Sequence, residues 1–250
     1  MSFINKVVLV TGAGSGIGEA ICLHFAKLSA RLSLVDKDAG NLKKTAEICE
    51  KLSRAKVLTT VADLRIDTQV KEAVENTKKQ FGKIDVVINC AGIYKPASIF
   101  DANLIEVYDD ILSSNLRSIV SMTNCVAEEL AKTNGNIINV SSVSGAFKCA
   151  LYKASAGALD HFTASVALEL ASKGVRINSI APGVVKTSIL ANAGVDQEER
   201  EALWNEASSS PLNKLVKTED VVELAAFLAS DKAKAMTGCT YPVDAGLALA

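Results

Sequence analysis

Thr11-Gly12-Ala13-Gly14-Ser15-Gly16-Ile17-Gly18 carries the strongest structural signal in this chain. It follows a short apolar run at residues 7–10 and leads into an amphipathic segment that begins at Glu19. The pattern predicts a buried strand, a glycine-rich turn and a helix. Glycines let the turn bend tightly and let backbone N–H groups approach a phosphate with no Cβ in the way. Since the first N–H groups of the following helix also favour an anion, the stretch predicts a phosphate-binding turn.

A second apolar run, residues 31–35, ends at Asp36, which lies 18 residues after Gly18. A dinucleotide-binding fold carries an acidic residue at about this position, where it hydrogen-bonds the adenosine ribose. The alternative is a glycine turn with an unrelated surface aspartate, and the strand before the turn and the helix after it both disfavour that interpretation. The residues expected to hold a dinucleotide here are Gly12, Ser15, Gly16, Ile17, Gly18 and Asp36.

Strands and helices alternate along the rest of the chain. Apolar runs predict strands at 56–61, 84–89, 135–142, 175–180 and 241–243, and helical periodicity predicts helices at 39–53, 67–81, 103–132, 151–173 and 218–230. Residues 187–217 are polar and are expected to be irregular. Helices of this length between strands favour a parallel sheet with right-handed crossovers, so the chain is predicted to be one α/β domain over residues 1–250.

Composition excludes several classes of function. With 49% apolar residues, 27 basic and 28 acidic residues, the chain has no basic surplus for nucleic acid and no polybasic arm for a membrane surface. No apolar run is long enough to span a bilayer, and the first strand begins too early for a signal peptide, so a cytoplasmic protein is expected. Six scattered cysteines with no C-x-x-C pair predict reduced thiols, and single histidines predict no metal site.

Several motifs of one family occur along the chain in the family's order. They are T-G-x-x-x-G-x-G at 11–18, Asp63-Leu64, Asn89-Cys90-Ala91-Gly92 for N-N-A-G, Asn115, Ser142, Tyr152, Pro182-Gly183 with Thr187 for P-G-x-x-x-T, and Val243-Asp244-Ala245-Gly246 for V-D-G-G. With these motifs the chain resembles the short-chain dehydrogenase/reductase family from end to end. The resemblance implies an NAD(P)-dependent oxidoreductase with a doubly wound, seven-stranded parallel Rossmann sheet, helices on both faces, and a homotetramer or homodimer.

The resemblance also implies further cofactor contacts and a substrate cap. Asp63 and Leu64 correspond to the pair that contacts adenine, and residues 187–217 correspond to the segment that caps the substrate. The other implied cofactor-binding residues are Asn89, Ala91, Gly92, Pro182, Gly183 and Thr187. Asp36 would accept hydrogen bonds from a ribose 2′-OH and repel a 2′-phosphate. Because Ser15 stands where NADP-preferring relatives usually carry a basic residue, NAD is the expected cofactor.

Three residues correspond to the family's catalytic groups. In the family, the counterpart of Tyr152 exchanges a proton with the alcohol or ketone, the counterpart of Ser142 hydrogen-bonds the substrate oxygen, and the counterpart of Asn115 holds a water in the proton relay. These roles require the groups to lie within hydrogen-bond reach of one another. The expected reaction is the interconversion of a small-molecule secondary alcohol and a ketone by hydride transfer.

The sequence departs from the family beside the tyrosine. Relatives carry a lysine four residues after it, and this chain has Ala156 there. Lys153 is a poor substitute, since adjacent helix positions point about 100° apart whereas i and i+4 share a face. A cation about 4 Å from the phenol, at an effective dielectric near 20, is worth roughly 4 kcal/mol, enough to bring a tyrosine from about 10 toward neutrality. Ser142 and Tyr152 are also only 10 residues apart, fewer than in relatives, and Lys148 in this short loop is another source of a cation.

Two hypotheses therefore remain open at the level of sequence. The first is an NAD(H)-dependent oxidoreductase, which the retained cofactor motifs, Asn115, Ser142 and Tyr152 favour. The second is a catalytically impaired NAD-binding pseudoenzyme or subunit, which Ala156 and the short loop favour.

Overall fold

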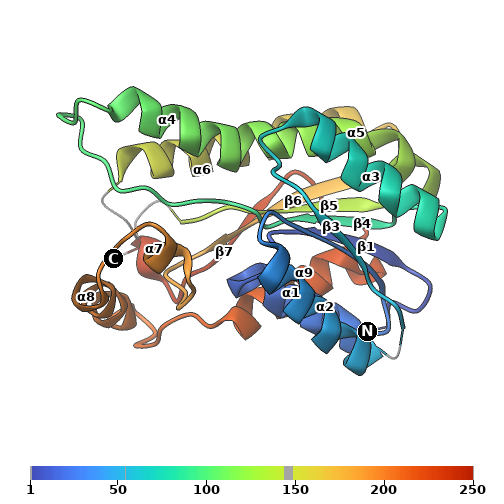
Figure 1. Cartoon of the computed structure of the whole chain (residues 1–250), viewed down its shortest axis with the longest axis horizontal. Coiled ribbons are helices and arrows are strands. Elements are labelled where there is room, and N and C mark those ends of the chain that lie inside the picture. The colour runs from blue at the N-terminus through green and yellow to red at the C-terminus, as the bar shows by residue number, and fades with distance from the viewer. Residues whose placement is uncertain (1, 54, 144–148, 250) are drawn as a thin grey trace.

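The computed structural model describes residues 2–53, 55–143 and 149–249. In these residues seven parallel strands form one sheet, in the order β3-β2-β1-β4-β5-β6-β7 (Figure 1). The strands are β1 Val7–Thr11, β2 Arg31–Asp36, β3 Leu58–Val61, β4 Val86–Asn89, β5 Asn136–Val140, β6 Arg176–Pro182 and β7 Thr240–Val243. All six neighbouring pairs are parallel. The predicted α/β Rossmann fold with a doubly wound seven-stranded sheet is confirmed.

Helices cover both faces of the sheet (Figure 1). One layer contains α1 Gly16–Lys27, α2 Ala39–Ser53 and α9 Thr218–Ala229, and the other contains α3 Asp67–Phe81, α4 Leu104–Leu112, α5 Ser118–Thr133 and α6 Ala150–Ala171. Successive strand side chains point to opposite faces, so Val8 and Val10 join one core cluster while Leu9 joins the other. Because both faces are buried, the strands are continuous apolar runs rather than alternating ones.

The strand order reverses between β1 and β4. The chain winds outward from β1 through β2 to β3, and then crosses back to β4 and continues to β7. In open α/β sheets, ligands bind beyond the carboxyl ends of the strands at such a switch point. The turn at residues 11–18 leaves the carboxyl end of β1, so the fold brings it to this crevice.

The prediction that residues 187–217 are irregular is wrong. This segment contains α7 Ile189–Asn192 and α8 Gln197–Ser208. Helix α8 begins where the Asp196 side chain accepts a hydrogen bond from the Glu199 N–H group at 2.8 Å, which satisfies one of the free donors of the first turn. Few apolar residues mark this helix, so its periodicity is weak in the sequence.

The long helix predicted over 103–132 is also divided. A π-helical segment, Ser113–Arg117, separates α4 from α5 and contains Asn115. Segments of this kind occur mostly as single turns inside α-helices, frequently at functional sites.

Among the residues that the structure describes, no helix is both long and apolar enough to cross a bilayer.

Candidate active site

A cavity of about 1000 Å³ opens along the carboxyl ends of the strands. Its wall contains every residue that the sequence predicts for the site except Asn89. The predicted residues in the wall are Gly12, Ser15, Gly16, Ile17, Gly18, Asp36, Asp63, Leu64, Ala91, Gly92, Asn115, Ser142, Tyr152, Pro182, Gly183 and Thr187. A cavity of this size is at the upper end of what cofactor sites usually occupy.

Asn89 lies beneath the cavity. Its side chain is 1% exposed, and its amide nitrogen donates a hydrogen bond to Asn139 Oδ1 at 2.9 Å. The motif places this residue in the last position of β4, where its side chain points into the interior and ties β4 to β5.

The glycine turn is packed too closely to accept side chains. A Cβ on Gly12, whose φ is +65°, would lie 2.8 Å from the Ala91 nitrogen, and one on Gly18 would lie 2.0 Å from the Gly12 oxygen. A Cβ on Gly16 would lie 3.1 Å from the Thr187 Cβ. The turn therefore meets the end of β4 on one side and the segment after β6 on the other. Ser15, Gly16, Ile17 and Gly18 at the start of α1 line the cavity, and the free N–H groups of a helix's first turn favour an anion such as a diphosphate.

Thr11 joins the two strand ends at the switch point. Its side chain is 1% exposed, and its hydroxyl oxygen accepts hydrogen bonds from the Cys90 and Ala91 N–H groups at 3.1 and 3.2 Å. A single oxygen thus satisfies two backbone donors where β4 ends.

Replacing Thr11 with valine is expected to destabilise the fold by about 1 to 3 kcal/mol, because two part-buried N–H groups lose their acceptor while the side-chain shape is kept. The free energy of unfolding from urea titration measures this. Thr59→Val is the matched control, since Thr59 is exposed on β3, and it is expected to change stability by less than about 0.5 kcal/mol. A Thr11 variant as stable as this control would contradict the role of its hydroxyl.

Asp36 lies at the end of β2 with both carboxylate oxygens engaged. Oδ2 accepts from the Gly14 N–H group and Oδ1 from the Asp38 N–H group, each at 2.9 Å. Each oxygen keeps a second lone pair, so the carboxylate can still accept hydrogen bonds from ribose hydroxyls. Asn41, whose backbone N–H group and side-chain Nδ2 each donate a hydrogen bond to the Asp38 carboxylate at 2.9 Å, also lines the cavity. The sequence motifs did not identify Asn41.

A series of ion pairs begins at Asp63 in the wall of the cavity. The Asp63 carboxylate accepts from Arg65 Nε at 3.0 Å and Nη2 at 2.6 Å, which lowers the pKa of Asp63. Arg65 Nη1 lies 3.5 Å from Asp110, which also pairs with Lys95. The hydrogen bond from Lys95 lowers the pKa of Asp110. All four side chains line the cavity, and the sequence analysis missed Arg65, Asp110 and Lys95.

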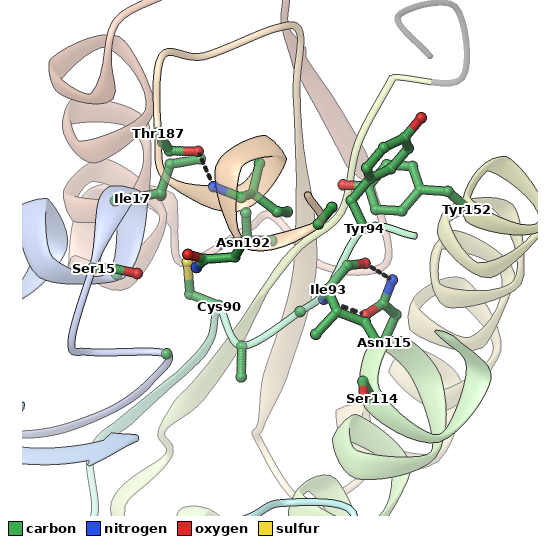
Figure 2. Close-up of a pocket in the computed structure, with 18 of the residues that line it drawn as sticks. Ser15, Ile17, Cys90, Ile93, Tyr94, Ser114, Asn115, Tyr152, Thr187 and Asn192 are labelled. Atoms are coloured by element: carbon green, nitrogen blue, oxygen red, sulfur yellow. Dashed lines mark hydrogen bonds between the residues drawn. The ribbon is translucent and has the colours of Figure 1, made fainter. Parts of the chain in front are cut away.

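Tyr152 and Ser142 meet at the other end of the cavity. Tyr152 reaches into it from α6 beside Tyr94, with ring centroids 5.5 Å apart and the ring planes at 78° (Figure 2). Burial raises the pKa of Tyr152 above its ordinary value, and a hydrogen bond with the Ser142 side chain partly opposes this rise. The two hydroxyls therefore lie within hydrogen-bond reach of one another in the cavity wall.

The Asn115 side chain holds a loop. Its Oδ1 accepts from the Ile93 N–H group at 2.8 Å and its Nδ2 donates to the Ile93 carbonyl at 2.9 Å (Figure 2). Nδ2 also lies 3.3 Å from the Ser155 hydroxyl. With both polar atoms engaged, this side chain fixes the segment after β4 against α6.

Ala156 is 7% exposed and lies in the cavity wall one turn after Tyr152. Its methyl group brings no charge to this part of the wall. Lys148, the other cation source considered, lies outside the described residues. Within the described ranges, no group of three His, Cys, Asp or Glu residues is arranged to hold a metal ion.

The segment after β6 forms a small apolar cluster over the site. Val184, Leu190, Val195 and Ala207 are buried there, with Tyr94, Tyr152 and Trp204 packed against them. Lys186 Nζ lies 4.9 Å from the ring centroid of Trp204.

Comparison with known proteins identifies the family of the chain. A family model described as "Enoyl-(Acyl carrier protein) reductase" matches residues 12–248. The 3-oxoacyl-[acyl-carrier-protein] reductase FabG of Thermotoga maritima is 34% identical, with 100% of both chains covered. The chain belongs to the short-chain dehydrogenase/reductase family of oxidoreductases.

Two solved structures of this family resemble the chain closely. The crystal structure of levodione reductase has a TM-score of 0.91 and 31% identity, with 99% of both chains covered. The 3-ketoacyl-(acyl-carrier-protein) reductase of Brucella melitensis complexed with NADH has a TM-score of 0.85 and 32% identity, with 99% of this chain and 100% of that one covered.

Proposed function

We propose that this protein is an NAD(H)-dependent oxidoreductase that interconverts a secondary alcohol and a ketone. The observation that supports this best is the presence, in one cavity, of the phosphate-binding turn and Asp36 at one end and the hydrogen-bonded pair Tyr152–Ser142 at the other. A bound nicotinamide dinucleotide would supply the hydride acceptor or donor.

Each residue has a role that follows from its contacts. The Tyr152 hydroxyl takes a proton from the alcohol or gives one to the ketone, and the Ser142 hydroxyl binds the substrate oxygen. Asn115 keeps the Ile93 segment in place as a wall of the site. Asp36 accepts from the adenosine ribose and repels a 2′-phosphate, which favours NAD(H) over NADP(H). Residues 187–217 cover the substrate through α7, α8 and the apolar cluster around Leu190.

A second candidate function is favoured by one observation, Ala156 in the wall beside Tyr152. In this alternative the protein binds NAD(H) with little or no turnover and acts as a subunit or dinucleotide sensor.

NADH and NADPH titrations followed by fluorescence, and then NADH oxidation with a panel of ketones, test the proposal. NADH is expected to bind at least about tenfold more tightly than NADPH, a difference of about 1.4 kcal/mol. Turnover that disappears in Tyr152→Phe is expected for the enzyme, whereas binding without turnover supports the second candidate. Failure to bind NADH would overturn both.

Two further properties are proposed with this function. Leu168 on α6 is 80% exposed and Val120 on α5 is 39% exposed, which supports a homodimer or homotetramer formed through these helices. All six cysteines are free thiols, which supports a reducing, cytoplasmic location.

A further inference from the structure

Tyr94 is a cavity residue that none of the sequence motifs includes. It follows β4 and, like Tyr152, lines the cavity. The residue before it, Ile93, exchanges two hydrogen bonds with the Asn115 side chain at 2.8 and 2.9 Å. The carbonyl of the residue after it, Lys95, accepts a hydrogen bond from Cys149 Sγ at 3.2 Å. The backbone at Tyr94 is therefore held from both sides, which gives its ring a defined place in the wall.

The Tyr94 ring packs directly against Tyr152. The ring centroids are 5.5 Å apart and the ring planes meet at 78°, an edge-to-face arrangement that aromatic pairs prefer (Figure 2). The two side chains reach this contact from different elements, Tyr152 from α6 and Tyr94 from the segment after β4. A ketone whose oxygen is hydrogen-bonded to the Tyr152 hydroxyl has its substituents within about two bonds of that oxygen. The Tyr94 ring is therefore within reach of a substituent.

Apolar side chains continue the wall beyond Tyr94. Ile189 and Ala193 line the cavity, and they pack with the two tyrosines against the small buried cluster that contains Leu190. Ligand sites are usually built in this way, with apolar and aromatic walls around a few polar groups. The Tyr152 hydroxyl and its hydrogen-bonded partner would bind the substrate oxygen, and the apolar wall would contact the remainder of the molecule.

Charge is scarce in the wall around Tyr152. Apart from residues at or after the ends of β2 and β3, at the predicted dinucleotide site, the charged residues that the structure describes in the wall are Lys95 and Asp110. These two form an ion pair with each other. Ala156, one turn after Tyr152, adds no charge. A charged substituent would thus lose hydration here without a described counter-ion, which is costly, whereas an uncharged one would not.

We propose that Tyr94 is a specificity-determining residue, whose ring forms the wall that receives the substituent of an uncharged, ring-bearing ketone. The oxygen of this ketone binds at Tyr152 and Ser142. The inference rests on the proposed function for the reaction itself. Contact between Tyr94 and the ketone does not require turnover, and so it is measured separately.

Three ketones separate the effect of the ring from that of charge. Acetophenone carries a ring, butan-2-one has none, and benzoylformate carries the same ring beside a carboxylate. In each reduction NADH supplies the hydride to the carbonyl carbon and Tyr152 supplies the proton to the oxygen. The protein is expected to reduce acetophenone with a kcat/KM at least about tenfold above that of either other ketone.

Variants of Tyr94 test the source of this preference. In Tyr94→Leu the ratio of kcat/KM for acetophenone to that for butan-2-one is expected to fall about tenfold, because the aromatic contact is lost. Tyr94→Phe keeps the ring and is expected to keep the ratio. Tyr108→Leu is the matched control, because Tyr108 is 45% exposed on α4 and lies outside the cavity wall.

A second measurement reads the contact without turnover. Labelling with 3-fluorotyrosine gives ¹⁹F resonances for the four tyrosines, and Tyr94→Phe and Tyr108→Phe assign those of Tyr94 and Tyr108. Acetophenone is added to the protein saturated with NAD, the oxidised cofactor, which cannot reduce it. The Tyr94 resonance is expected to shift saturably, and the Tyr108 resonance is expected to stay in place.

Equal losses of kcat/KM for acetophenone and butan-2-one in Tyr94→Leu would show a purely structural role and overturn the inference. So would a ratio in Tyr94→Leu equal to that in Tyr108→Leu, a preference for benzoylformate, or a Tyr94 resonance that acetophenone does not move. If Tyr94→Leu does not fold, the resonance in the parent protein decides. A saturable shift without turnover of any ketone overturns the proposed function and supports Tyr94 as part of a site for ring-bearing ketones.

Discussion

Ala156→Lys is expected to raise the rate of alcohol oxidation by at least about tenfold at pH 8. Residue 156 shares a helix face with Tyr152 and lines the cavity, so a lysine stem can extend along the wall toward the phenol. An ammonium about 4 Å away, at an effective dielectric near 20, favours the phenolate by roughly 4 kcal/mol. At about 1.4 kcal/mol per pKa unit, the phenol would lose its proton up to about three units lower.

The lysine is expected to move the rise of the oxidation rate with pH to lower pH. Burial raises the pKa of Tyr152, so in the parent protein the phenolate base is scarce and oxidation is expected to increase up to the highest pH at which the protein stays folded. The lysine lowers the pKa, so the same increase is expected at lower pH. Ketone reduction uses the protonated phenol and is expected to change less.

Ala156→Met is the matched control, because it adds a side chain of similar length without charge. It is expected to leave the pH profile of oxidation unchanged. If methionine and lysine raise the rate equally, space filling and not charge is responsible. If neither raises a measurable parent rate, the parent turns over without a cation at position 156, and the impaired alternative fails. If no form turns over, the impaired alternative is supported.

The sequence predicted those parts of the site that are encoded locally. The turn at 11–18, Asp36 and the residues after β6 each follow from a short motif at the end of a strand, and parallel strand ends converge at one edge of the sheet. The wall of the cavity therefore contains nearly all of them. Asn89 is the predicted residue that is absent from the wall. The side chain of the last residue of a strand can point either into the crevice or into the core, and the hydrogen bond from Asn89 to Asn139 holds this one in the core.

The parts of the site that could not be predicted from the sequence depend on residues far apart in the chain. The rim pairs join Arg65, Asp110 and Lys95 from three separate segments, and no motif records that they meet. Helix α8 was missed for another reason, since its apolar face is narrow and much of its packing is against the cluster around Leu190.

Gly18→Ala is expected to abolish NADH binding, with at least about a hundredfold loss of affinity, about 2.7 kcal/mol, and to lower the melting temperature. Gly18 is the third residue of α1. A Cβ added to it would lie 2.0 Å from the Gly12 oxygen and 2.7 Å from the Gly12 carbonyl carbon. Neither atom belongs to a flexible side chain, so the turn itself must shift. Gly12 is in turn held against Ala91, which leaves the turn no room to move without disturbing the end of β4.

Gly157→Ala is the matched control for this variant. Gly157 is exposed in α6, and a Cβ there would meet nothing within 4 Å, so alanine is expected to stabilise the protein by about 0.5 to 1 kcal/mol through helix propensity. NADH fluorescence titration and thermal unfolding of both variants separate the two effects. The same chemical change is thus expected to act in opposite directions at two helical glycines, because only Gly18 has another backbone in the place of its missing side chain. If Gly18→Ala binds NADH as tightly as Gly157→Ala, the turn at residues 11–18 is not the phosphate site.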